Sequence, residues 1–147
     1  MTITKRDNTC LQAAGLASGT TAAKVKTVNA IGYTINGRTY AKAATDDLFT
    51  LSGAVMAAGE VQVIWLYLNA SGTASVAASA VKKASTTTST TERYVAGAFD
   101  WPDPVDKCVV GAVVITATGA FTPGTTSTAS MCVFVNAGPD YGAPITY

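Results

Sequence analysis

The side chains that could act as acids, bases or nucleophiles are few in this sequence. Its 147 residues include nine aspartates and glutamates, three cysteines and no histidine. Histidine is the commonest general base, the usual partner of a serine or cysteine nucleophile and the commonest zinc ligand. Its absence argues against a conventional hydrolase, and we expect a protein that is not an enzyme and holds no cofactor.

Asp46, Asp47 and Glu60 are the first candidates for a catalytic pair of carboxylates. Two carboxylates that face each other across a groove can hydrolyse a glycosidic bond. Nothing in the sequence brings two acids together in that way. We therefore predict that Asp46 is a turn or helix-capping residue.

A second acidic group, Asp100, Asp103 and Asp106, is spaced at three-residue intervals around Pro102 and Pro104. Carboxylates on a loop can ligate Ca²⁺ through their oxygens. The spacing does not match that of an EF-hand, and no further cluster of Asp or Asn lies nearby. The prediction is a solvated loop without a metal.

Three cysteines, Cys10, Cys108 and Cys132, show no CxxC spacing, which argues against a metal or thioredoxin-like site. Cys108 and Cys132 lie in two strong strand candidates and could pair within the chain, although synthesis in the cytoplasm keeps thiols reduced. Cys10 lies in a small, polar N-terminal stretch and is best placed to reach another subunit. Our hypothesis is an intersubunit disulfide through Cys10, formed after release into an oxidising medium; three inert thiols are the alternative.

Five aromatic residues could form a platform on which a sugar stacks: Trp65, Trp101, Tyr33, Tyr40 and Tyr67. Trp65 and Tyr67 would share one face of a central strand, so we assign them to the core. Trp101, beside Pro102, is the better candidate for an exposed contact.

The element that organises the chain is the apolar run Val61 to Leu68, which is rich in β-branched and aromatic residues. Both of its faces are mostly apolar, which indicates a central strand covered on both sides. The turn sequence Asn69-Ala-Ser-Gly72 follows, and Thr73 to Val76 can return antiparallel.

Other strands are predicted by similar signals. Lys24 to Ala44 indicates a hairpin around Asn36-Gly37, the preferred pair for a type I′ turn. Lys107 to Thr118 indicates a second strong strand, in which Gly111 marks a bulge or a close backbone approach. Met131 to Val135 indicates a third. Residues 85–91 are expected to be a loop, and 94–99 a weak strand.

With five or six short strands and no amphipathic helix, we predict an all-β fold, an antiparallel β-sandwich or jelly-roll-like domain. The domain would span residues 24–135. Residues 1–23 would form an N-terminal arm and residues 136–147 a C-terminal tail, both contacting other subunits.

The amino-acid composition limits the classes of partner that the protein can bind. Hydrophobic residues make up 48% of the chain, charged residues only 13%, and the net charge is +1. No basic footprint for nucleic acid is present, and no run of 18 apolar residues could cross a membrane. Residues 1–7 lack the apolar core of a signal peptide, so we expect synthesis in the cytoplasm and release by lysis.

Four segments together resemble small β-rich structural proteins of tailed bacteriophages. Ile35-Asn-Gly-Arg-Thr-Tyr-Ala-Lys-Ala-Ala44 resembles their I-N-G-(K/R)-aromatic-A-K-A hairpin, and Phe121-Thr-Pro-Gly-Thr-Thr126 resembles their F-T-P-G-T-T. Between them lie the core strand with Leu68-Asn-Ala-Ser-Gly72, and Trp101-Pro-Asp-Pro-Val-Asp-Lys107 followed by the strand that ends at Ile115. The resemblance covers residues 28–135.

The resemblance implies a non-enzymatic protein of the virion head surface, made in the host cytoplasm. It would be a capsid decoration or cement protein, a homotrimer that bridges subunits of the major capsid protein. Such proteins often lack cysteine, so the three here suggest covalent reinforcement. The alternative is a tail-fibre or receptor-binding β-module for host glycan, with Trp101 as the residue to test. A glycan-active enzyme is disfavoured by the scarcity of acids.

Overall fold

The computed structural model describes residues 8–83, 98–99, 101–138 and 145–146. These residues form thirteen strands and no helix, and every strand pairing is antiparallel. The predicted all-β class is confirmed. The number of strands is larger than predicted, because several of them are only two or three residues long.

A central sheet carries the two longest strands, β7 (Glu60–Asn69) and β11 (Lys107–Thr116). Its order is β12-β11-β7-β8, where β12 is Cys132–Asn136 and β8 is Ala74–Ala78. The short β9 (Lys82–Lys83) also pairs with β7. All eight interior residues of β7 are buried, as the apolar pattern on both of its faces predicted.

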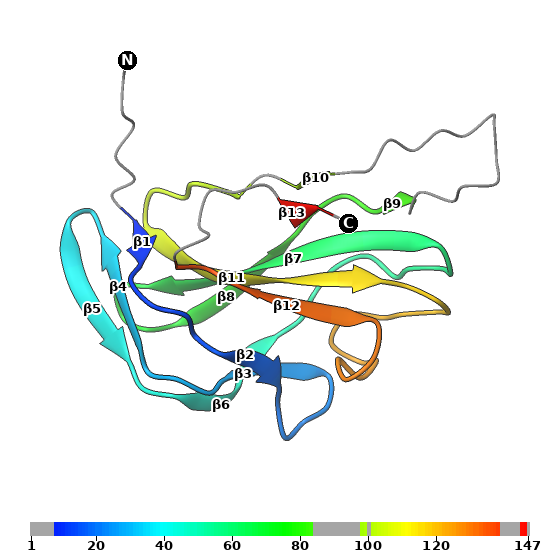
Figure 1. Ribbon diagram of the computed structural model, residues 1–147, viewed down its shortest axis with the longest axis horizontal. Coiled ribbons are helices and arrows are strands. Elements are labelled where there is room, and N and C mark those ends of the chain that lie inside the picture. The colour runs from blue at the N-terminus through cyan, green and yellow to red at the C-terminus, as the bar shows by residue number, and fades with distance from the viewer. Residues whose placement is uncertain (1–7, 84–97, 100, 139–144, 147) are drawn as a thin grey trace, which may run out of the picture.

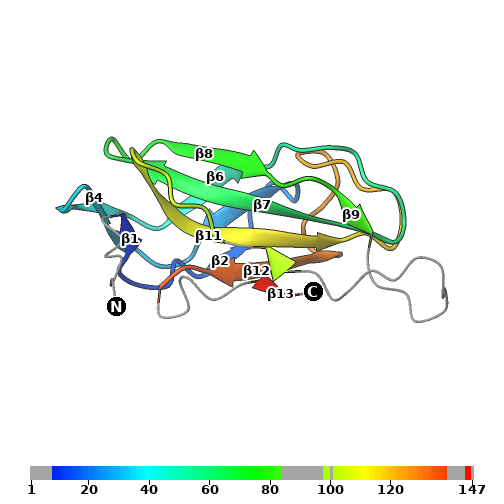
Figure 2. The ribbon, with the colours of Figure 1, turned by 90° about the horizontal axis from the view of Figure 1, so that it is seen from above.

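Two three-stranded sheets lie against one face of the central sheet (Figures 1 and 2). One has the order β1-β4-β5 (Thr9–Cys10, Ile31–Ile35 and Arg38–Lys42). The other has the order β2-β3-β6 (Leu16–Ser18, Lys24–Thr27 and Thr45–Thr50). Each strand of the first sheet is joined by a short connection to a strand of the second. The two sheets therefore form one layer with a single crease, and the connections that cross the crease are residues 11–15, 28–30 and 43–44.

The opposite face of the central sheet carries the aromatic residues of β7. Figure 1 places β10 (Ala98–Phe99) and β13 (Ile145–Thr146), which pair with each other, on this side. Trp65 packs here on Trp101, with 5.3 Å between ring centroids. Trp101 is only 7% exposed, so the expected exposed contact is wrong. Its indole covers the apolar face that the two smaller sheets leave free.

The predicted turn chemistry is confirmed at three places. In the turn between β4 and β5, Asn36 and Gly37 have φ values of 50° and 76°, as a type I′ turn requires. After β7, the Asn69 side chain accepts hydrogen bonds from the backbone N–H groups of Ser71 and Thr73. The register of β11 against β7 shifts between Val109 and Gly111, which is the predicted bulge.

The N-terminal stretch differs from the expected arm, because residues 8–23 belong to the folded body. They contain β1 and β2, and Ala14 and Leu16 are buried. A Cβ on Gly111 would lie 2.4 Å from Leu16 Cδ1, so the missing side chain of Gly111 makes room for Leu16. Residues 1–7 lie outside the described part of the chain.

The start of the expected tail also belongs to the body. Asn136 ends β12, its side chain accepts a hydrogen bond from Leu16 N (3.0 Å), and Ala137 is buried. The first residue of the tail is therefore tied to strand β2, whereas Ile145 and Thr146 pair with β10. Residues 139–144 and 147, the loop predicted at 85–91 and residues 94–97 lie outside the described residues.

Candidate functional site

Asp46 and Asp47 lie in strand β6, so the turn or helix-capping position predicted for Asp46 is wrong; their side chains instead hold a turn between two other strands. Both carboxylates accept hydrogen bonds from the turn before β3: Asp46 from the N–H and hydroxyl of Thr20, and Asp47 from those of Thr21. The hydroxyl of Thr20, followed by its N–H, lowers the pKa of Asp46. Both acids are therefore engaged in fixing the β2–β3 turn.

Three further acids, Glu60, Asp103 and Asp106, lie in the described part of the chain. Glu60 accepts a hydrogen bond from Ala57 N (2.8 Å) and closes the turn before β7. Asp103 and Asp106 are exposed, and Asp100 lies outside the described residues. Within residues 8–83, 98–99, 101–138 and 145–146, no group of three or more Cys, Asp or Glu side chains could hold a metal ion.

The three thiols are free; Cys10 and Cys108 are buried, and Cys132 is half-buried. Cys10 is 2% exposed, and its thiol donates to Gln12 O (3.1 Å), so the predicted reach from a free arm is wrong. Burial, followed by the nearby Cys10, raises the pKa of Cys108 to about 12, and burial raises that of Cys132 to about 11. Thiolates are the reactive form, so the raised pKa values of Cys108 and Cys132 disfavour reaction of these thiols at neutral pH.

The register of β11 against β12 keeps Cys108 and Cys132 apart. The two strands are neighbours, as expected, but Cys132 lies opposite Ile115, seven residues along β11 from Cys108. At the usual rise per residue that separation is about 23 Å, whereas a disulfide needs Cα atoms about 4–7 Å apart. The predicted pairing within the chain is therefore wrong.

The aromatic candidates separate into a core set and one ring beside a hollow. Trp65, Tyr67, Trp101 and Tyr33 are buried, whereas Tyr40 on β5 is half-buried and stacks on Tyr33 with ring centroids 5.7 Å apart. Tyr40 lines an open hollow of about 490 Å³, which we call the Tyr40 hollow. Its lining residues are Ile35, Asn36, Arg38, Tyr40, Ala70 and Asp106.

Two buried polar groups fix the walls of the Tyr40 hollow. The side chain of Asn8, 4% exposed, accepts a hydrogen bond from Asn36 N and donates one to Pro104 O. Asn8 thereby ties the β4–β5 hairpin to the loop that carries Asp106. The hydroxyl of Tyr33 donates to Asn69 O (2.8 Å) and ties the same hairpin to the turn that carries Ala70.

The sequence does not predict that the residues lining the Tyr40 hollow lie together. Asn36 was recognised for its turn and Asp106 for its loop, but their neighbourhood depends on Asn8, which carries no motif. The only available signal was the pairing of a type I′ hairpin with an aromatic residue on its return strand.

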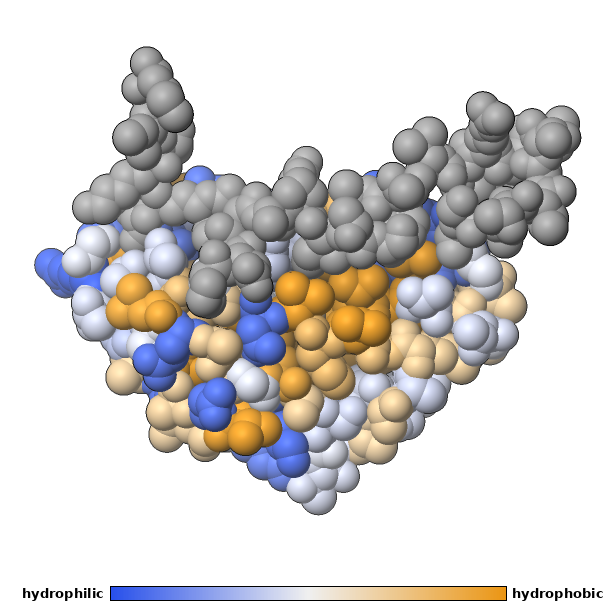
Figure 3. All heavy atoms as spheres, in the orientation of Figure 1, coloured by the Kyte–Doolittle hydropathy of each residue, from blue (hydrophilic) through white to orange (hydrophobic). Residues whose placement is uncertain are grey.

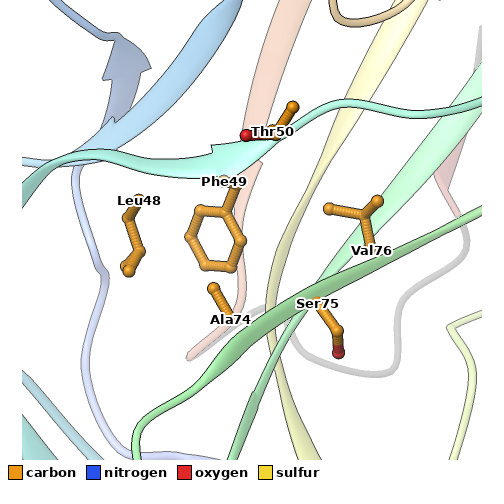
Figure 4. A pocket seen from close by; sticks show the side chains of 6 residues that line it. All are labelled: Leu48, Phe49, Thr50, Ala74, Ser75 and Val76. Atoms are coloured by element: carbon orange, nitrogen blue, oxygen red, sulfur yellow. The ribbon is translucent and has the colours of Figure 1, made fainter.

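A second hollow opens between the edges of two sheets (Figure 4). Leu48, Phe49 and Thr50 on β6 and Ala74, Ser75 and Val76 on β8 line a groove of about 200 Å³. β6 and β8 are not hydrogen-bonded to each other in any sheet. The groove offers no titratable side chain and thus no chemistry.

The edge strand β12 is apolar and partly exposed. Figure 3 shows apolar residues gathered in the middle of the face that contains β11 and β12. The sequence Met131-Cys-Val-Phe-Val135 carries no charge, and the side chain of Val133 is 62% exposed. An apolar edge strand is a template for association.

Comparison with known proteins gives no match for this chain, whether against family models, curated proteins or solved structures. The part of the chain described here also contains no helix that is long and apolar enough to cross a membrane.

Proposed function

We propose that this chain is a non-enzymatic structural protein of a bacteriophage virion that decorates the head and bridges subunits of the major capsid protein. The observation that carries the proposal is the uncharged edge strand β12 with Val133 exposed. A soluble monomer usually protects such an edge with charges, proline or a covering element. An edge left apolar fits a protein whose working state includes a partner.

The physical effect of such a protein is simple. A protein that binds the assembled shell but not its free subunits stabilises the shell by mass action. An extended segment of a capsid subunit can pair with β12 through main-chain hydrogen bonds, while its side chains bury Val133 and Val135. A charge-poor surface lowers the desolvation cost of that contact.

The resemblance of residues 28–135 to phage structural proteins supports the same assignment. It leads us to propose a homotrimer located at the head surface, built on a β-sandwich. One layer of the sandwich would be the central sheet, and the other the creased pair of three-stranded sheets.

The test is co-sedimentation of the purified protein with phage heads that lack it. The parent protein should sediment with the heads, and Val133→Lys should not, because the substitution places a charge in the contact. Val55→Lys is the matched control, since Val55 is 67% exposed and lies in the loop before β7. If the parent stays in the supernatant, or if both variants bind equally well, the proposal fails.

The alternative, a tail-fibre or receptor-binding module for host glycan, loses Trp101 as its contact residue because that side chain is buried. Among the described residues, the Tyr40 hollow is the feature that favours recognition of a sugar. Recognition of a sugar there is compatible with a place on the head.

A further inference from the structure

Opposite charges line the Tyr40 hollow without neutralising each other. Arg38 on β5 and Asp106 in the loop before β11 both contribute to its wall, and both side chains are exposed. Among the described residues, neither forms an ion pair or a side-chain hydrogen bond. A purely anionic ligand would meet the charge of Asp106, and a purely cationic ligand would meet that of Arg38.

An aromatic ring supplies the apolar part of the wall. Tyr40 is half-buried, and its position is fixed by stacking on the buried Tyr33 at an interplanar angle of 27°. The face of an aromatic ring is electronegative, so it attracts the weakly positive C–H groups on one side of a sugar ring. Ala70 leaves space beside it, because its side chain is a single methyl group.

The geometry is fixed before any ligand arrives. Asn8 and Tyr33 connect the three segments that form the walls through hydrogen bonds from buried side chains. A ligand would therefore pay little for ordering the backbone, which is the main benefit of preorganisation. The volume of about 490 Å³ falls within the range of about 300–1,000 Å³ that is usual for small-molecule sites.

We propose that the Tyr40 hollow binds a saccharide. One sugar ring lies against Tyr40, its hydroxyl groups donate to the carboxylate of Asp106, and its oxygens accept from the guanidinium of Arg38 and the side-chain amide of Asn36. A neutral polyhydroxyl ligand satisfies both charges at once, whereas an apolar ligand would strip water from them without replacement. A small zwitterion could also match both charges, but it would make no use of the aromatic ring of Tyr40.

The test is a titration of the full-length ¹⁵N-labelled protein followed by NMR. The probes are methyl glucoside, methyl galactoside, methyl mannoside and N-acetylglucosamine, with sulfate and glycine as the anionic and zwitterionic probes. The variants are Arg38→Gln and Asp106→Asn. Asp103→Asn is the matched control, since Asp103 is an exposed acid of the same loop that does not line the hollow.

We expect at least one sugar to shift the amide signals of residues 35–40 saturably. Arg38→Gln and Asp106→Asn should each weaken the binding of that sugar by about tenfold or more, because each substitution removes a hydrogen bond to a charged group. Asp103→Asn should bind as the parent does. The proposal is overturned if no sugar shifts these signals, if all three variants bind equally, or if sulfate or glycine saturates them in place of the sugars.

This proposal and the decoration role fail separately. Arg38→Gln and Asp106→Asn should still sediment with heads, because β12 is unchanged in both. Val133→Lys should still bind the sugar, because Val133 does not line the Tyr40 hollow.

Discussion

Substitution of Gly111 by alanine tests how the N-terminal strands dock on the central sheet. The added Cβ would lie 2.4 Å from Leu16 Cδ1 and 2.4 Å from the carbonyl oxygen of Val135. Leu16 can rotate away, but the carbonyl belongs to the backbone of β12, so the two strands must separate. Overpacking of this kind costs about 1–3 kcal/mol, and we expect the upper part of that range because one of the two contacts is with backbone.

The expected loss of about 2–3 kcal/mol in the free energy of unfolding corresponds to a fall in melting temperature of about 6–10 °C for a chain of this size. Thermal unfolding followed by circular dichroism measures it. Gly119→Ala is the control, because a Cβ there would only touch Met131 Cε at 4.0 Å and the backbone of Gly119 has no positive φ. It should melt within about 2 °C of the parent.

A double substitution makes the prediction sharper. Leu16→Ala removes one of the two contacts, so Gly111→Ala combined with Leu16→Ala should cost less than the sum of the two single changes. If Gly111→Ala melts at the temperature of the parent, Leu16 does not sit over Gly111. The placement of β2 against the central sheet would then be wrong.

Three further predictions follow from the packing and the titratable groups. Trp65→Ala should lower the free energy of unfolding by about 3–5 kcal/mol in a denaturant titration, because its indole is buried against Trp101; an unchanged midpoint would contradict the core assignment. Burial raises the pKa of Cys108 to about 12 and that of Cys132 to about 11, so above the unfolded-state value of 9.0 only the folded protein keeps these protons. The free energy of unfolding should therefore fall between pH 9 and about 12, and the part due to Cys132 should be lost by about pH 11. Replacing both cysteines by alanine should reduce that slope, and iodoacetamide should modify neither thiol in the native protein at pH 7. Asp47→Ala should speed amide hydrogen exchange at Thr21, because it removes the acceptor of the Thr21 N–H; the exchange rate of Thr34, which lies in the other three-stranded sheet, should not change.

The parts of the fold that the sequence could predict depend on local signals. The apolar runs of β7 and β11, the Asn36-Gly37 turn and the role of Gly111 each follow from a few adjacent residues. Each of these features is determined by residues that are adjacent in the sequence.

The parts that could not be predicted depend on contacts between distant segments. Trp101 was expected to be exposed because its loop contains two prolines, yet its burial is decided by Trp65, 36 positions earlier in the chain. Residues 8–23 were expected to form an arm because their small side chains show no periodicity. The position of Leu16 depends on its contact with Gly111, a residue 95 positions later in the chain, and that contact is known only from the folded structure.

The candidate site shows the same division. The absence of histidine chemistry can be read from the sequence, but the turn predicted for Asp46 is wrong: Asp46 lies in strand β6, and its carboxylate accepts a hydrogen bond from Thr20 in the distant β2–β3 turn. The Tyr40 hollow combines residues from positions 35 to 106 and is held by Asn8. A buried asparagine with two backbone partners has no signature in a single sequence.

The crease in the three-stranded layer divides its ladder hydrogen bonds into two sets. The strand ladders stop at residues 28–30, so β1-β4-β5 and β2-β3-β6 are separate ladders in one layer, joined at the crease by hydrogen bonds from Val28 N to Gly15 O and from Asn29 N to Ala14 O. Cooperative opening tends to follow such units. The ladder amides of the two halves should therefore exchange with solvent as two separate groups, each with its own rate.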